Sequence, residues 1–109
     1  MSLHDIDCKI VERALDDLFA AGFTVDVNDG EDTVLFNSQD KPAIFAAMCS
    51  TCEDVLVVRK KMLNGMTGRK IGILHLIHGN EPGVIIADNS TSLEPYLLGA
   101  IELANQLTD

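Results

Sequence analysis

Residues 53–88 read EDVLVVRKKMLNGMTGRKIGILHLIHGNEPGVIIAD, and this stretch decides the fold. It contains three runs rich in Val, Ile and Leu, the residue types that favour β-strands: Val55–Val58, Ile71–Ile77 and Val84–Ala87. The pairs that separate the runs are typical of tight turns: Asn64-Gly65 and Pro82-Gly83. The stretch therefore predicts a three-stranded antiparallel meander.

The first two of these strands are apolar on both faces. Successive side chains of a strand point to opposite sides of the sheet, so each strand contributes two sets. One side would carry Val55, Val57, Ile73 and Ile77, and the other Leu56, Val58, Leu74 and Leu76. A strand of this kind is covered on both sides, either by helices or by a second molecule.

The N-terminal third predicts a helix followed by a hairpin. Apolar residues recur every three or four positions over residues 3–21, which is the spacing of an amphipathic helix. Residues 23–28 then alternate between apolar and polar, as in a half-buried strand. The chain turns at residues 28–30, and we expect Val34 and Phe36 to point inward from the partner strand.

Two further helices are predicted from their start signals. Asp40 with Pro42 just inside indicates a short helix that continues to about Ser50. Thr91 with Glu94 three residues later fits a capping box at the start of a closing amphipathic helix.

The order of elements is helix, two strands, helix, three strands, helix. We predict an α+β fold of order αββαβββα, a five-stranded antiparallel sheet with three helices packed on its faces. Residues 1–109 show no boundary or repeat, so we expect a single domain. This order, at this length, resembles the roadblock-type and profilin-like sandwich.

A second resemblance lies in the C-terminal third, on four segments: His78-Gly79-Asn80, Val84–Asp88, Leu93-Glu94 and Leu103-Ala104. With these segments the chain is similar to small phage- and prophage-encoded proteins of unknown function. The resemblance implies an origin in a mobile element and no activity.

Composition limits the class of protein. The chain has 109 residues, of which 47% are hydrophobic, but no run approaches the roughly 20 apolar residues of a membrane-spanning helix. No signal segment opens it, and an odd number of cysteines, three, favours reduced thiols over disulfides. We therefore expect a cytoplasmic protein that does not bind a membrane.

Charge is distributed very unevenly in this acidic chain of net charge −9. Residues 1–54 hold twelve acidic and three basic side chains, and residues 81–109 hold five acidic and no basic ones. Residues 55–80 hold five basic side chains and no acidic ones. All five cations flank the loop between the first two strands of the meander.

The strongest candidates for chemistry are Cys49 and Cys52, which with His75 and His78 would make a zinc ligand set. His75 and His78 are three apart in a predicted strand, so they face opposite sides of the sheet. A reactive C-x-x-C pair needs a helix N-terminus, whereas this pair follows the C-terminal end of a helix. We expect packing thiols, no metal, no cofactor and no enzymatic activity.

The basic loop, residues 59–70, is the predicted partner-binding site. Exposed methionines between cations form an adaptable contact surface. The residues predicted to contact a partner are Arg59, Lys60, Lys61, Met62, Met66, Arg69 and Lys70. A solvated hairpin tip whose charges protect the sheet edge is a further interpretation of the same loop.

These observations predict a non-enzymatic protein-binding accessory factor. We expect a homodimer, because the second helix is too short to cover a sheet that is apolar on both faces. The alternative is a nucleic-acid-binding protein that uses residues 59–70 as phosphate contacts. The net charge of −9 and the scarcity of aromatic residues, 5% of the chain, weigh against that alternative.

Overall fold

The structure of the chain is a computed structural model, which describes residues 5–28, 32–48, 53–62, 66, 68–77 and 86–108. Its elements confirm the predicted α+β class and the order αββαβββα, with a short 3-10 turn added before the last helix. They are α1 (Asp5–Ala20), β1 (Phe23–Asn28), β2 (Thr33–Ser38), α2 (Lys41–Ala47), β3 (Glu53–Lys60), β4 (Lys70–Ile77), β5 (Ile86–Asn89), η1 (Thr91–Leu93) and α3 (Glu94–Thr108).

The five strands form one antiparallel sheet in the order β2-β1-β3-β4-β5. The predicted meander, β3 to β5, is confirmed as three adjacent strands of the sheet. The N-terminal hairpin joins it through β1, which pairs with β3 from Phe23 opposite Lys60 to Asn28 opposite Val55. The two strands that are apolar on both faces are therefore central, with neighbours on each side.

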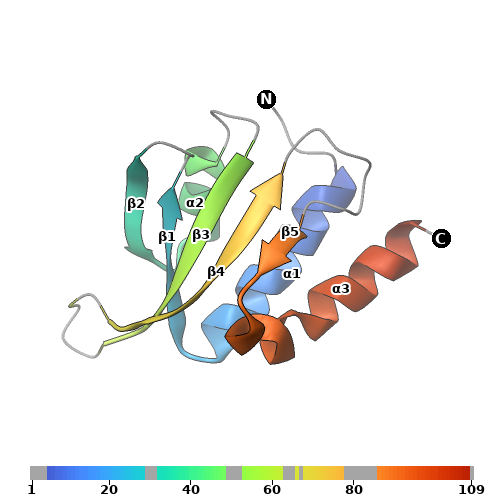
Figure 1. The fold of residues 1–109 in the computed structure, drawn as a ribbon. Helices are drawn as coiled ribbons and strands as arrows, with labels where there is room; N and C mark the ends of the chain where they lie inside the picture. The colour runs from blue at the N-terminus through green and yellow to red at the C-terminus, as the bar shows by residue number, and fades with distance from the viewer. Residues whose placement is uncertain are drawn as a thin grey trace.

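In Figure 1, α1 and α2 lie behind the sheet, and α3 runs beside its β5 edge, packed along α1. All three helices contribute to one core on the same side of the sheet. The helices touch one another there: Lys41 of α2 donates from Nζ to Asp16 Oδ1 of α1 at 2.7 Å, and α1 packs along α3. The expectation of helices on both faces of the sheet is wrong, because α2 packs Ile44 and Met48 into the same core as α1. The described elements therefore form two layers, the sheet and one layer of helices.

The hydrophobic core fills the space between the sheet and this helix layer. Its buried members include Ile10, Leu15 and Leu18 of α1, Val25 and Val27 of β1, Ile44 of α2, Leu56 and Val58 of β3, Leu74 and Leu76 of β4, and Leu97 and Ala100 of α3. We call the side of the sheet that carries these residues the core face, and the opposite side the outer face.

Local signals explain where two of the elements begin and end. Asp40 caps α2 as predicted, its Oδ1 accepting a hydrogen bond from the Ala43 backbone N–H at 3.4 Å. After α1 ends, Gly22 takes a positive φ of 88°, which glycine adopts without steric cost.

The capping box predicted at Thr91 and Glu94 does not form. Thr91 instead begins the 3-10 turn η1, and Glu94 closes that turn through its backbone N–H to the Thr91 carbonyl oxygen. The segment is held against β4 by two serines: Ser90 Oγ accepts from the Ile73 N–H at 2.9 Å, and Ser92 Oγ donates to the Ile71 carbonyl at 2.8 Å. These bonds to the sheet replace a local helix cap.

The prediction that Val34 and Phe36 point inward is also wrong. Leu35 pairs with Val27 and packs on the core, so Val34 and Phe36 face the other way and are 47% and 67% exposed. A register shift follows in β2, where Asn37 has a φ of 55°. The alternation of side chains in β2 was predicted correctly, but the set of residues that faces the core was not.

Several predicted features lie outside the described residues. They are the Cys49–Cys52 pair, His78, and the turns at residues 29–30, Asn64-Gly65 and Pro82-Gly83. The described helices include none that is long and apolar enough to cross a membrane.

Candidate functional site

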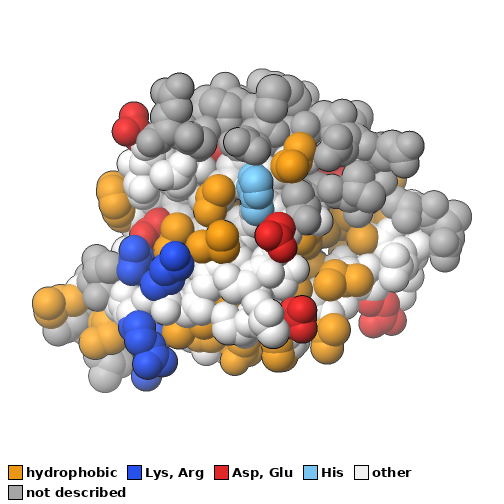
Figure 2. All heavy atoms as spheres, viewed as in Figure 1, with side chains coloured by type: hydrophobic (Ala, Val, Ile, Leu, Met, Phe, Trp, Pro, Cys, Tyr) orange, Lys and Arg blue, Asp and Glu red, His pale blue; other side chains and the backbone are white. Residues whose placement is uncertain are grey.

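The centre of the outer face is an apolar strip on β3 and β4. We define the outer-face strip by Val55, Val57, Ile73 and Ile77, with His75 among them; all five are half-buried. They alternate with the fully buried core residues of the same strands, so they point away from the helices. Figure 2 views this face: hydrophobic side chains and one acidic side chain lie beside the single histidine of the described surface. The strand register places the exposed Asp88 of β5 opposite His75.

The β2 edge adds two exposed hydrophobic residues to this face. Val34 and Phe36 are the apolar side chains that the register of β2 places on the outer side. Scattered apolar residues are normal on a surface, but a group on one sheet face that no described helix covers is typical of a contact surface.

A polar network separates the β2 edge from the strip. Asp26 of β1 is only 4% exposed and accepts two hydrogen bonds of 2.7 Å, from Arg59 Nε and from the Asn37 backbone N–H. Thr24 Oγ1 in turn donates to Asn37 Oδ1 at 2.7 Å. The positive φ of Asn37 is thus held by Asp26 and Thr24, and a buried carboxylate has a charged partner.

This network engages one cation of the basic loop and leaves the other four exposed. Arg59, predicted as a partner contact, turns its guanidinium to Asp26 and to the Gly68 carbonyl oxygen at 3.3 Å. The other four cations, Lys60, Lys61, Arg69 and Lys70, are exposed and gather at one end of the sheet, which we call the basic end. Met62 and Met66, predicted as contacts, are exposed beside them, at 40% and 63%.

The opposite end of the sheet is acidic. Because β1 and β3 are antiparallel, β1 ends, and β2 begins, at the end remote from Lys60. The exposed carboxylate described there is Asp32, which directly precedes β2 and marks what we call the acidic end. In the sequence, Asp29 and Glu31 belong to the same connection. This polarity was not predicted, because it depends on the direction in which β1 pairs with β3.

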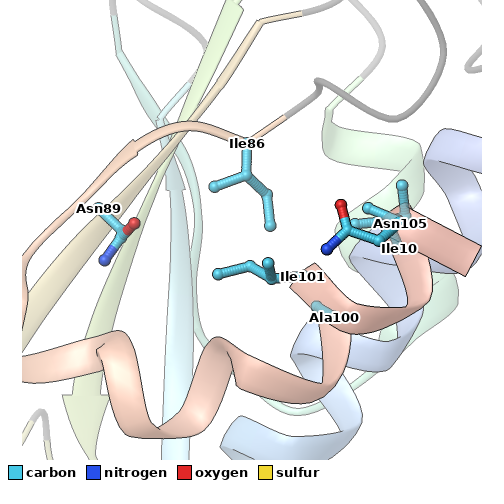
Figure 3. Close-up of a pocket in the computed structure, with 7 residues that line it drawn as sticks. Ile10, Ile86, Asn89, Ala100, Ile101 and Asn105 are labelled. Carbon is cyan, nitrogen blue, oxygen red and sulfur yellow. The ribbon is translucent and has the colours of Figure 1, made fainter. Parts of the chain in front are cut away.

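A cavity of about 240 Å³ lies on the other side of the molecule, between α3, α1 and β5. Figure 3 shows Ile86 and Ile101 pointing into it from opposite sides, with the amides of Asn89 and Asn105 at its border. Among the described residues of the lining there is no carboxylate, histidine, thiol or cation, so these residues offer no group for acid–base or nucleophilic chemistry. Its volume is also below the range of about 300–1,000 Å³ that is usual for ligand pockets.

Chemically active side chains do not converge among the described residues. No group of three or more potential metal ligands occurs in that part of the chain. Two buried carboxylates were not predicted: Asp7 on α1 is 3% exposed, and Asp54 at the start of β3 is fully buried on the core face. Each has an interaction partner within the chain. Their sequence neighbourhood gives no signal for burial, because each stands beside apolar residues of an ordinary helix or strand.

Comparison of the chain with protein-family models, with curated proteins and with solved structures finds no match. The candidate site is therefore defined by geometry: an apolar strip and a satisfied polar network on the outer face, with oppositely charged groups at the two ends of the sheet.

Proposed function

We propose that the protein is a non-enzymatic accessory factor that binds another protein molecule through the outer face of its sheet. One observation carries the proposal: all three helices lie on the core face, while the opposite face of the two central strands is built from valine and isoleucine. A half-buried aliphatic sheet face gains stability when a partner removes it from water, by about 25 cal/mol per Å² of apolar area.

The chemistry of the face favours a protein over other partners. Aliphatic side chains on a pleated surface interdigitate with the same kind of side chain, as in packed sheets. The exposed methionines at the basic end add adaptable contacts. The charge at both ends would orient a partner without providing the main gain in free energy.

Affinity capture from a native extract tests the proposal. Wild-type protein, Val57→Lys and the control Glu102→Lys are immobilised separately; Glu102 is exposed on α3, in the helix layer. Wild type and control should retain the same proteins, and Val57→Lys should lose them because a lysine would stand in the centre of the strip. Equal retention by all three would refute a role for the outer face.

Nucleic-acid binding is the second candidate, favoured by the four exposed cations of the basic end. If they contact phosphates, log–log plots of affinity against salt should have a slope of roughly −4 on duplex DNA. Lys60→Ala with Lys61→Ala should then reduce the slope by about two. We expect no measurable binding at physiological salt, since carboxylates within a Debye length of about 8 Å repel a polyanion. Saturable binding that this double substitution abolishes would make the second candidate the better proposal.

A cytoplasmic location and an origin in phage or prophage remain predictions from the sequence. Neither is needed for the proposed contact surface.

A further inference from the structure

We propose that the cavity between α3, α1 and β5 is a binding site for one apolar residue of a peptide chain, with the side chain in the cavity and the adjoining backbone held at its border. The site is separate from the outer face, so the proposal goes beyond the proposed function and does not depend on it. It follows from the size of the cavity, the chemistry of its lining and the two amides at its border.

The size of the cavity matches a single side chain. Its volume is about 240 Å³, and an apolar cavity of about 150 Å³ already admits a group as large as benzene. A leucine or phenylalanine side chain therefore fits. Ile101, which lines the cavity, is 44% exposed, and Asn105 at its border is exposed as well. A side chain can therefore enter from solvent.

The described lining is apolar except for the two amides. Ile86 and Ile101 face each other across the cavity in Figure 3, and Ile10, Ala100 and Ala104 complete the apolar wall. This wall is stabilised by contact with a branched aliphatic or aromatic group. Its described residues carry no charge, so the ammonium and carboxylate groups of a free amino acid would lose water without gaining a partner. A neutral residue inside a peptide chain has no such cost.

The two amides at the border can satisfy the hydrogen-bonding groups of a peptide backbone. Asn89 Nδ2 donates to the Ser90 carbonyl oxygen at 3.0 Å, so Asn89 Oδ1 remains to accept from a peptide N–H. The exposed Asn105 side chain forms no hydrogen bond with a described residue, so it can donate to a peptide carbonyl oxygen. Each peptide unit offers one donor and one acceptor, which this pair of amides matches.

Titration with blocked amino acids, followed by NMR spectroscopy, tests the site. The probe is N-acetyl-leucine N′-methylamide, which carries one apolar side chain between two peptide groups. It should shift the methyl signals of Ile86 and Ile101 and the side-chain amide signals of Asn89 and Asn105. The shifts should saturate with a dissociation constant on the order of 1 mM.

Two related compounds measure what the cavity recognises in the probe. N-acetyl-alanine N′-methylamide should bind at least about tenfold more weakly than the leucine probe, because it buries less apolar surface. 3-Methylbutan-1-ol has the branched chain without the peptide groups, and it should bind at least about fivefold more weakly because it cannot pair with both amides.

Substitutions on α3 locate the bound probe. Ala104→Phe should abolish the shifts, because the larger side chain fills the cavity. Ile101→Ser removes an apolar wall at a position that is already partly in water, and it should weaken binding about tenfold. Asn105→Ala should weaken binding about fivefold by removing the donor. The matched control Gln106→Ala changes a neighbouring exposed amide and should bind as wild type does. Circular dichroism confirms that each variant is folded.

Three results would overturn the proposal. The absence of a saturable shift at about 20 mM leucine probe, well above the expected dissociation constant, excludes the site. Binding that survives both Ala104→Phe and Ile101→Ser takes place elsewhere on the protein. Equal affinity for the leucine probe and for 3-methylbutan-1-ol would show that the amides take no part. Each of these results leaves the outer face untouched, because Val57→Lys tests that surface separately.

Discussion

The two faces of β3 and β4 have the same kind of sequence and opposite surroundings. Leu56, Leu74 and Leu76 are fully buried under the helices, whereas Val57 and Ile73, one position away, are half-buried on a face that no described helix covers. Hydrophobic alternation assigns residues to two sides of a strand. It does not say whether helices or a partner cover each side.

Two ion pairs differ in burial in the same way as the two faces of the strands. Arg59–Asp26 on the outer face and Lys41–Asp16 between the helices have equal N–O distances of 2.7 Å. The side chain of Asp26 is 5% exposed, and that of Asp16 is 50% exposed. Distance alone therefore does not measure what a pair contributes, because water competes for the exposed one.

The largest expected effect separates the two faces in the monomer. Leu74→Ala should lower the free energy of unfolding by about 2–5 kcal/mol, because it leaves a cavity in a packed core. Ile73→Ala should cost about 1 kcal/mol or less, since that side chain is only partly buried and leaves no enclosed cavity. Urea denaturation at a concentration where sedimentation shows a monomer measures both. Equal losses would mean that the outer face is covered within the chain.

The next effect compares what the buried and the exposed ion pair each contribute to stability. Asp26→Asn should lower the free energy of unfolding by about 1–3 kcal/mol, because two hydrogen bonds to a buried charge are weakened and Arg59 loses its counter-charge. Asp16→Asn, matched in chemistry and in N–O distance, should change it by no more than the experimental error. Thermal denaturation of both variants is the measurement, and similar losses would contradict the assigned difference in burial.

The smallest effect is a pH dependence in the helix layer. A hydrogen bond from Lys41 to Asp16 raises the pKa of the lysine above 10.5, with smaller contributions from the charges of Asp16 and Glu12 and partly opposed by desolvation. A raised lysine pKa stabilises the fold below the ordinary value, and this stabilisation is lost as the pH rises through the raised pKa.

Lys41→Met should therefore be slightly less stable than wild type at neutral pH. The difference should vanish above the lysine transition, as followed by urea denaturation across that range. A difference that persists unchanged above that transition would show that Lys41 acts through its aliphatic chain and not through its charge.

Most of the secondary structure could be predicted because its signals are local. Asp40 caps α2 through its own neighbour Ala43, and Gly22 adopts the positive φ that follows α1. The errors arose where tertiary contacts outweighed local signals. Thr91 enters a turn held by serine bonds to β4, and Leu35 displaces Val34 and Phe36 from the core because of its register with Val27.

The candidate site could be predicted only in part. The basic residues were found because they flank one short loop in the sequence, but Arg59 proved to be engaged with Asp26, which lies 33 residues away. The acidic end and the polar network could not be found, since both depend on β1 lying beside β3.

The sequence by itself determined the α+β class, the order of the elements and two apolar sides for each central strand, because propensity, alternation and capping act over a few residues. Only the tertiary structure decided that every helix packs on the same side, that Asp26 meets Arg59, and that the basic and acidic residues lie at opposite ends of the sheet. Those features depend on strand order and direction, which are set by the burial of whole layers and not by any one segment.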